Sequence, residues 1–275
     1  MDPEVFAAIA TECAEYGTVL WLHFLGEPLL HDGIADMVSV AKQMGVAQVG
    51  LSTNGVALHG ALAERLMDAG LDRLECSMDA DDRDTYMAMR GRDHFARVKA
   101  NVRGFLARKQ VRGRIRPITS VQFMRTPEVD AQLANLVEEW RPWLGPRDFV
   151  MTIEPASFGG AIHGSPPRAV VATPPTARTA CAWLFHSLVI LQDGTVTMCG
   201  ADWDAQAPLG NIRNSTIAAI WNGAEMRRRR DAHRAGRFAA VGPCAGCEDW
   251  RLADGHGYTN ALEELASGAD LTPSA

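Results

Sequence analysis

The stretch TVLWLHFLGEP (residues 18–28) determines the fold class of this chain. Residues 18–24 form a short apolar run, and Gly26 and Pro28 interrupt it directly afterwards. An amphipathic segment follows from about residue 32 to residue 44 and stops at Gly45. A continuous apolar run of this length is typical of a strand that is buried on both faces of a parallel sheet. The order strand, loop and helix therefore predicts one unit of an α/β fold.

The same unit repeats along the first half of the chain. A helix comes first, at residues 3–16, and no strand precedes it. We predict five strands in all, each followed by a helix or loop, which is the pattern of a parallel barrel whose first strand is missing. Beyond residues 18–24, the predicted strands are 47–52, 73–78, 116–124 and 148–153, and the predicted helices are 32–44, 59–69, 82–89, 95–109 and 127–140.

Composition places the chain among ordinary globular proteins. Its 275 residues are 47% apolar and 22% charged, and they carry a formal net charge of -6. That charge provides no positive field for nucleic acid or anionic lipid, so we expect neither as a partner. The sequence has no apolar run of the roughly 20 residues that a membrane helix needs, and the first residues are acidic where a signal peptide is basic. We expect a cytoplasmic location.

A change of composition separates a second, smaller domain. Residues 154–178 are rich in Pro, Gly and Ala, which predicts a linker, and we place the boundary near residue 165. The expected domains are therefore 1–165 and 166–275. In the second, Asp193-Gly194 predicts a hairpin, and helices are expected at 215–221 and 224–235. The run Arg227 to Arg230 lies inside the last helix, where we expect a solvated face.

Four of the six cysteines fall in the last third of the chain and suggest a metal centre. Cys181 and Cys199 flank the predicted hairpin, whereas Cys244 and Cys247 form a C-x-x-C pair. Four thiolates suit either a zinc ion or an iron–sulfur cluster, so the spacing alone leaves both open. Cys13 and Cys76 stand apart from this group, and we expect both in the core.

The cysteine pattern resembles a known cluster domain. Twelve residues separate Cys181 from Gly194 and four separate Gly194 from Cys199, and LGNIRNSTIAAIWNG (209–223) precedes the C-x-x-C pair. This pattern is similar to the SPASM and Twitch domains of radical S-adenosylmethionine (SAM) enzymes, which bind auxiliary 4Fe-4S clusters. No cysteine follows Cys247 in this sequence. The resemblance therefore implies one auxiliary cluster, as in Twitch, held by Cys181, Cys199, Cys244 and Cys247.

Four motifs in the first half resemble the same enzymes. LGEP (25–28), STNG (52–55), SMD (77–79) and RG (90–91) each follow a predicted strand or helix in the family's order, although the first Gly of the usual GGEP is Leu25. The resemblance implies a partial (βα)6 TIM-like barrel followed by a small α+β domain. It also implies that six residues orient SAM: Gly26, Glu27, Ser52, Asn54, Ser77 and Asp79.

One departure concerns the cluster that activates SAM. Radical SAM enzymes carry C-x-x-x-C-x-x-C after the first barrel strand, and these 275 residues contain no such motif. Without it the chain should not cleave SAM. We expect a segment with this motif, and with it a second 4Fe-4S cluster, to precede residue 1. The alternative is a naturally degenerate protein.

The resemblance implies an oxidoreductase-type reaction. In such an enzyme a 5'-deoxyadenosyl radical abstracts hydrogen from an unactivated carbon of a small metabolite or peptide, while flavodoxin or ferredoxin supplies the electron. The auxiliary cluster would accept an electron from the substrate or orient it. Two alternatives remain: an inactive iron–sulfur or partner-binding protein derived from the family, and a zinc-stabilised barrel.

Overall fold

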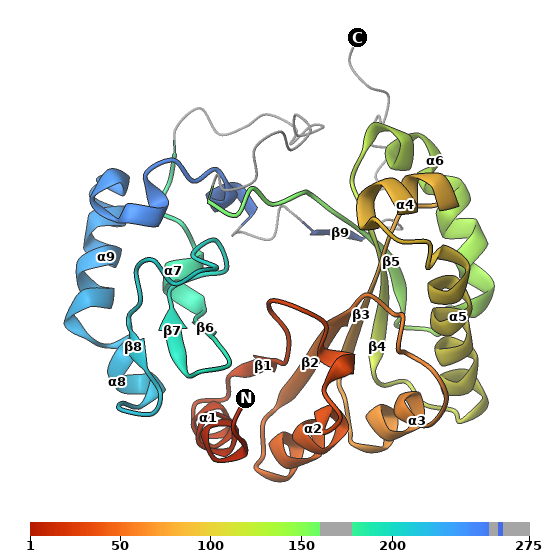
Figure 1. The fold of residues 1–275 in the computed structure, drawn as a ribbon, viewed down its shortest axis with the longest axis horizontal. Coiled ribbons are helices and arrows are strands. Elements are labelled where there is room, and N and C mark those ends of the chain that lie inside the picture. The colour runs from red at the N-terminus through yellow and green to blue at the C-terminus, as the bar shows by residue number, and fades with distance from the viewer. Residues whose placement is uncertain (160–177, 253–257, 261–275) are drawn as a thin grey trace. The chain divides into compact units, whose positions relative to one another are not determined.

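The computed structural model describes residues 1–159, 178–252 and 258–260. The chain divides into two compact units, coloured along the chain in Figure 1. One unit comprises Cys13–Ile153 with Tyr258–Ala275, and the other comprises Met1–Glu12 with Glu154–Gly257. The predicted boundary near residue 165 lies outside the described residues.

A parallel sheet forms the core of the first unit, as predicted. Its strand order is β1-β2-β3-β4-β5, with β9 antiparallel at the β5 edge. The first strand is shorter than predicted because the imidazole of His23, through Nδ1, accepts the Ser52 N–H that a longer backbone ladder would use. The strands are β1 (Val19–Trp21), β2 (Gln48–Thr53), β3 (Arg73–Asp79), β4 (Ile118–Met124), β5 (Phe149–Ile153) and β9 (Tyr258–Asn260).

Helices cover one face of this sheet, as Figure 1 shows. Alternate residues of β3, namely Leu74, Cys76 and Met78, are fully buried, so this face supplies apolar contacts. Cys13 is also buried, and the prediction that Cys13 and Cys76 belong to the core is confirmed. The helices of this unit are α2 (Ile34–Gln43), α3 (Gly60–Asp68), α4 (Arg83–Arg90), α5 (Phe95–Val111) and α6 (Pro127–Trp140).

A buried ion pair joins α5 to the amino-terminal ends of β4 and β5. Lys109 and Asp148 are bonded to each other, and their side chains are 2% and 1% exposed. The Lys109 ammonium also donates to the carbonyl of Pro117 at 2.9 Å, and Asp148 accepts the Thr119 N–H at 2.8 Å. Because a buried charge is tolerated only when its hydrogen bonds are satisfied, this network fixes the register of the two strands.

The second unit contains a small antiparallel sheet of order β6-β7-β8. The predicted hairpin at Asp193-Gly194 is present, with Gly194 at a φ of +90°. Neither β8 nor the short helix α7 is predicted from the sequence, because two or four residues carry no measurable periodicity. The elements are β6 (Val189–Ile190), β7 (Thr195–Thr197), β8 (Gly210–Asn211), α7 (Trp183–His186), α8 (Ile217–Trp221) and α9 (Ala224–Arg234).

The helix α1 (Pro3–Glu15) caps α8 through Glu12. The Glu12 carboxylate accepts the backbone N–H groups of Ile217 at 2.9 Å and Ala218 at 3.1 Å. The first N–H groups of a helix have no partner within the helix, and a carboxylate also complements the helix dipole. The hydroxyl of Thr216 accepts a third N–H, from Ala219. The amino-terminal end of α8 is thus stabilised by a residue about 200 positions away.

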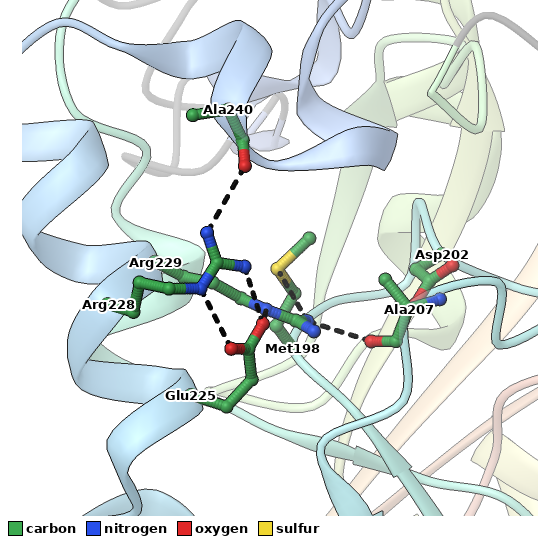
Figure 2. Close-up of polar contacts among 7 residues, drawn as sticks. All are labelled: Met198, Asp202, Ala207, Glu225, Arg228, Arg229 and Ala240. Atoms are coloured by element: carbon green, nitrogen blue, oxygen red, sulfur yellow. Dashed lines mark hydrogen bonds and ion pairs between the residues drawn. The ribbon is translucent and has the colours of Figure 1, made fainter.

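The arginine run of α9 is not a solvated face, and that prediction is wrong for two of its members. Arg229 is 4% exposed and Arg230 is 9% exposed. Figure 2 shows Arg229 paired with Glu225 and directed toward Met198 and the carbonyl of Ala207, to which it donates at 2.7 Å. The run spreads around the helix, as predicted, but the two inward-facing guanidinium groups are buried, and each donates to backbone carbonyl groups.

Arg230 donates hydrogen bonds to backbone carbonyl groups of two short helices, α7 and α8. Its guanidinium donates to the carbonyl of Leu184 in α7 at 2.8 Å and to that of Trp221 in α8 at 2.9 Å. It also lies 3.9 Å from the centroid of the Trp221 ring. The last carbonyl groups of a helix lack intrahelical partners, so one buried cation completes the ends of both helices.

Candidate functional site

A pocket of about 440 Å³ lies at the carboxyl ends of β1, β2 and β3. In a parallel α/β sheet this end is where ligands bind, since the loops that follow the strands meet there. Five of the six residues predicted to orient SAM line the pocket, and Asp79 does not. The lining residues are His23, Phe24, Gly26, Glu27, Leu30, Ser52, Thr53, Asn54, Ser77 and Arg90.

Glu27 connects the loop after β1 to the loop after β2. One carboxylate oxygen, Oε1, accepts the hydroxyl of Thr53 at 2.6 Å and the N–H of Leu29 at 2.9 Å. The other, Oε2, accepts the N–H of Asn54 at 2.7 Å. An ionised carboxylate offers about four acceptor positions, so three bonds leave room for roughly one more donor.

The STNG loop is held in shape by its own residues and by α5. Gly55 has a φ of +73°, and a Cβ there would lie 2.9 Å from Cγ1 of Val98, so only glycine fits. The side-chain amide of Asn101 donates to the carbonyls of Gly55 and Val56 at 3.0 and 2.9 Å. The side-chain oxygen of Asn54 accepts the Val56 N–H at 3.0 Å, which is a turn-forming bond. This loop is therefore fixed before any ligand binds.

Asp79 holds Arg90 rather than lining the pocket. The two side chains form an ion pair at the end of β3, where the strand register shifts between Ser77 and Asp79. Asp79 has a φ of +63°, a conformation that is uncommon outside glycine and often marks functional sites. Burial raises the pKa of the Asp79 carboxyl, and the Arg90 charge opposes that shift. The role predicted for Asp79 in binding SAM stays a prediction.

Three polar residues of the pocket are not among the six predicted to orient SAM: His23, Thr53 and Arg90. His23 lies within the apolar run 18–24, just after the end of β1, and Thr53 lies inside the STNG motif. Burial lowers the pKa of His23 to about 4, so its imidazole is neutral at physiological pH. Because Nδ1 accepts the Ser52 N–H at 3.1 Å, the proton resides on Nε2. For His23 and Thr53, a position at or just after a strand end is the signal that would have identified them, whereas Arg90 is the last residue of α4.

Glu75 is a half-buried carboxyl on β3, in the same row of the sheet as the pocket residue Ser52. It is directly opposite Ser52 on β2 and Ser120 on β4 in the strand register. Neighbouring parallel strands present paired residues on the same face, so Glu75 shares a row with the pocket residue Ser52. Burial raises the pKa of Glu75 to about 7, and the Arg73 charge opposes the shift only in part. This carboxyl can therefore exchange a proton near neutral pH.

The four C-terminal cysteines gather in the second unit. Cys181, Cys199 and Cys244 belong to one buried hydrophobic cluster, and Cys247 is half-buried. Cys181 precedes α7, Cys199 follows β7, and Cys244 ends a single 3-10 turn. The Cys247 N–H donates to the carbonyl of Cys244 at 3.4 Å, which closes the C-x-x-C turn. The fold thus brings together four free thiols from three separate segments.

Electrostatic coupling shows that these thiols are neighbours. Burial raises the pKa of Cys181 and of Cys244 to about 12, and the other cysteines raise it further because thiolate charges repel. Burial also raises the pKa values of Cys199 and Cys247. A bound metal centre supplies the positive charge that converts thiols with raised pKa values into thiolates.

The thiols by themselves suit two kinds of metal centre. Four sulfurs can bind one tetrahedral zinc ion, and in a 4Fe-4S cluster each thiolate binds a different iron.

Two family models match this sequence. A radical SAM superfamily model matches residues 1–116, and a model of the SPASM iron–sulfur cluster-binding domain matches residues 181–248. Residues 1–116 are thus similar to the radical SAM superfamily, and residues 181–248 to its SPASM domain. These two domains imply SAM binding and 4Fe-4S clusters, so the family resemblance and the cofactors predicted from the sequence are confirmed. The SPASM match includes all four cysteines discussed above.

Curated relatives match part of the length of this chain. A probable GTP 3',8-cyclase of Methanothermobacter marburgensis is 34% identical over 104 residues, which is 38% of this chain and 34% of that protein. A GTP 3',8-cyclase of Chlorobaculum tepidum is 40% identical over 83 residues, or 30% of this chain and 25% of that protein. The chain therefore matches about a quarter to a third of the length of these relatives.

Solved structures share the fold over most of the chain. BtrN in complex with AdoMet and 2-DOIA has a TM-score of 0.58 and 19% identity, covering 90% of this chain and 80% of that one. Native anSMEcpe with bound AdoMet has a TM-score of 0.58 and 14% identity, covering 93% of this chain and 80% of that one. The predicted fold class, a partial barrel with a small appended domain, is confirmed. In the described part of this chain, no helix is long and apolar enough to cross a membrane.

Proposed function

We propose that the pocket at the ends of β1, β2 and β3 binds SAM through Gly26, Glu27, Ser52, Asn54 and Ser77, with Asp79 acting through Arg90. The observation that supports this assignment is that the pocket is lined by both a negatively charged side chain, Glu27, and a positively charged one, Arg90. Glu27 retains about one acceptor position, which suits an ammonium group, whereas Arg90 provides a cation that suits a carboxylate. An amino acid moiety carries both groups, and the serine hydroxyls suit a ribose.

We further propose that Cys181, Cys199, Cys244 and Cys247 hold one auxiliary 4Fe-4S cluster of the Twitch arrangement. The support is the set of four neighbouring thiols from three segments, three of them buried and one half-buried. The domain limits 1–165 and 166–275 belong to this proposal, since the first range would contain the SAM pocket and the second the cluster.

The reaction we propose is hydrogen abstraction. SAM and a reduced 4Fe-4S cluster, for which these 275 residues contain no C-x-x-x-C-x-x-C motif, would together supply a 5'-deoxyadenosyl radical, with flavodoxin or ferredoxin as a suitable electron donor. In this chain, Glu75 shares a row with Ser52 and has a pKa near neutrality, so it can hold or release a proton beside the bound substrate. His23, neutral and protonated on Nε2, offers a donor at the same edge of the sheet.

The substrate class we propose is a small molecule or a peptide. Similar structures contain both kinds of ligand: BtrN is described in complex with 2-DOIA, and anSMEcpe with a Kp18Cys peptide. The sequence relatives are named for GTP. The net charge of -6 gives no reason to expect a large polyanion such as nucleic acid.

Calorimetric titration with SAM tests the pocket without requiring turnover. We expect Ser77→Ala and Arg90→Gln each to weaken SAM binding by about tenfold, corresponding to about 1.4 kcal/mol. Ser39→Ala, on the helix α2, is the matched control and should bind as the wild type does. Equal affinity in all four proteins would place the SAM site elsewhere.

Metal analysis tests the cysteine assignment separately. After anaerobic reconstitution, the wild type should contain iron and acid-labile sulfide in equal amounts, and the Cys244→Ala, Cys247→Ala double variant should lose both. The Cys13→Ala variant is the control and should retain them, because Cys13 lies in the other unit. Zinc without labile sulfide would contradict the cluster and support the zinc-stabilised alternative.

A further inference from the structure

Two side chains near the four cysteines have buried hydrogen-bond donors without partners. His233 is 1% exposed, and its Nδ1 accepts the backbone N–H of Cys181 at 3.2 Å. The imidazole proton therefore lies on Nε2, which is buried and has no hydrogen-bond partner among the described residues. Nε and Nη2 of Arg178 are also buried, and neither has a hydrogen-bond partner among the described residues. Buried donors are nearly always paired, so each of these requires an explanation.

Arg178 and His233 both pack against one aromatic ring. The Arg178 guanidinium lies 4.2 Å from the centroid of Phe238, a cation–π distance. The His233 ring meets the same phenyl ring edge-on, with centroids 5.2 Å apart and an interplanar angle of 79°. Phe238 thus fixes the positions of both donor groups and leaves their N–H groups available.

The charge of Arg178 acts on the cysteines. Burial is the larger effect and raises the pKa values of Cys181, Cys244 and Cys247, and the nearby guanidinium lowers the pKa of each. The same charge adds to burial in lowering the pKa of His233. Among the described residues, no carboxylate accepts a hydrogen bond from the two buried nitrogens of Arg178. Because burying the N–H groups of a cation without an acceptor is costly, an anion is expected beside them.

A 4Fe-4S cluster with four thiolate ligands supplies that anion. The cluster with its ligands is negatively charged, and its sulfurs accept hydrogen bonds. Reduction adds one electron and no proton, so the negative charge grows by one. A fixed positive charge and N–H donors stabilise the reduced form more than the oxidised form, which raises the reduction potential.

We propose that Arg178, assisted by the Nε2–H of His233, donates hydrogen bonds to the sulfurs of the auxiliary cluster and raises its reduction potential. The inference rests on the proposed cluster ligands. Arg178 is a positioning and tuning residue in this role, since it contacts the cluster and not the substrate. It makes the cluster a better electron acceptor for a substrate-derived electron.

The test is a potentiometric titration of the reconstituted full chain with dithionite, followed by electron paramagnetic resonance of the reduced cluster. We expect Arg178→Gln to retain iron and labile sulfide and to lower the midpoint potential by about 59 mV, a tenfold change in the ratio of reduced to oxidised cluster. Arg178→Lys keeps the charge and should stay close to the wild type. His233→Gln should produce a smaller decrease.

Arg234→Gln is the matched control. Arg234 is also an arginine above an aromatic ring of the same unit, 5.1 Å from the Phe185 centroid, but its side chain is 60% exposed. Its loss should leave the midpoint potential unchanged. An unchanged potential in Arg178→Gln would overturn the inference, as would failure of both Arg178 variants to assemble a cluster, which would assign Arg178 to assembly. Absence of a cluster from the wild type itself would instead refute the proposed function.

Discussion

The carboxylate of Glu27 accepts a hydrogen bond from the hydroxyl of Thr53 at 2.6 Å. The two residues are 26 positions apart; Glu27 lies in the loop after β1, and Thr53 ends β2. With the bonds to Leu29 and Asn54, this contact makes one carboxylate responsible for the relative position of two pocket walls. Glu27 is therefore structural as well as a candidate ligand of SAM.

The Glu27→Gln substitution should lower both stability and SAM affinity. Each carboxylate oxygen accepts from a donor, and an amide must turn its NH2 group toward one of them, which leaves a donor unpaired. We expect a loss of about 1–3 kcal/mol in the free energy of unfolding. Urea denaturation and calorimetric SAM titration measure the two effects. Glu138→Gln, which breaks only an exposed pair with Arg141, should cost less than about 1 kcal/mol. Equal losses in both variants would contradict the role of Glu27.

Gly55 should be less tolerant of a side chain than Gly60. Both have positive φ, +73° and +52°, so alanine costs about 1–2 kcal/mol of backbone strain at either position. At Gly55 the new methyl group also meets Val98, whereas at Gly60 nothing lies within 4 Å. Gly55→Ala should therefore destabilise the protein by about 1–3 kcal/mol more than Gly60→Ala, because overpacking adds to strain. The midpoints of urea denaturation of the two variants measure this difference, and equal midpoints would contradict the prediction.

Neighbouring arginines of α9 should differ in how much each contributes to the free energy of unfolding. Arg230→Met leaves the carbonyls of Leu184 and Trp221 without their charged donor, and we expect a loss of about 2–4 kcal/mol. Arg228→Met removes a 54% exposed side chain that pairs with Glu225 and should cost about 0–1 kcal/mol. Thermal unfolding of the metal-free proteins compares them, and similar melting temperatures would refute the structural role of Arg230.

Glu75 should make the stability of the barrel unit depend on pH. Burial raises its pKa to about 7 in the folded state, above the ordinary value of 4.5. The folded state then binds more protons than the unfolded state between these values, so the free energy of unfolding decreases as pH rises from about 4.5 through 7. We expect a decrease on the order of 2 kcal/mol that Glu75→Gln abolishes.

Urea denaturation at pH 5, 6, 7 and 8 measures this dependence. Glu15→Gln, which removes an exposed carboxylate, should keep the wild-type profile. A wild-type profile that Glu75→Gln leaves unaltered would show that another group is responsible.

Local patterns in the sequence determined the elements that carry a full period of hydrophobicity. The helix predicted at 127–140 has the bounds of α6, and the strand predicted at 73–78 matches β3 within one residue. Motifs of three or four residues at strand ends identified five residues of the pocket for the same reason, because a parallel sheet brings consecutive strand ends to one edge. The cysteine spacing likewise identified the four thiols that the fold brings together.

Tertiary structure alone decided which partner each polar group finds. Nothing in the local sequence distinguishes Arg228 from Arg230. Yet the Arg228 side chain is 54% exposed, whereas Arg230 is 9% exposed and donates to carbonyl groups of two helices. Contacts such as Glu27 with Thr53, Glu12 with Ile217 and Arg178 with Phe238 join residues distant in sequence. Hydrophobic periodicity is local and is encoded over a few turns or strands, whereas burial, charge pairing and pKa depend on distant segments that only the folded chain brings into contact.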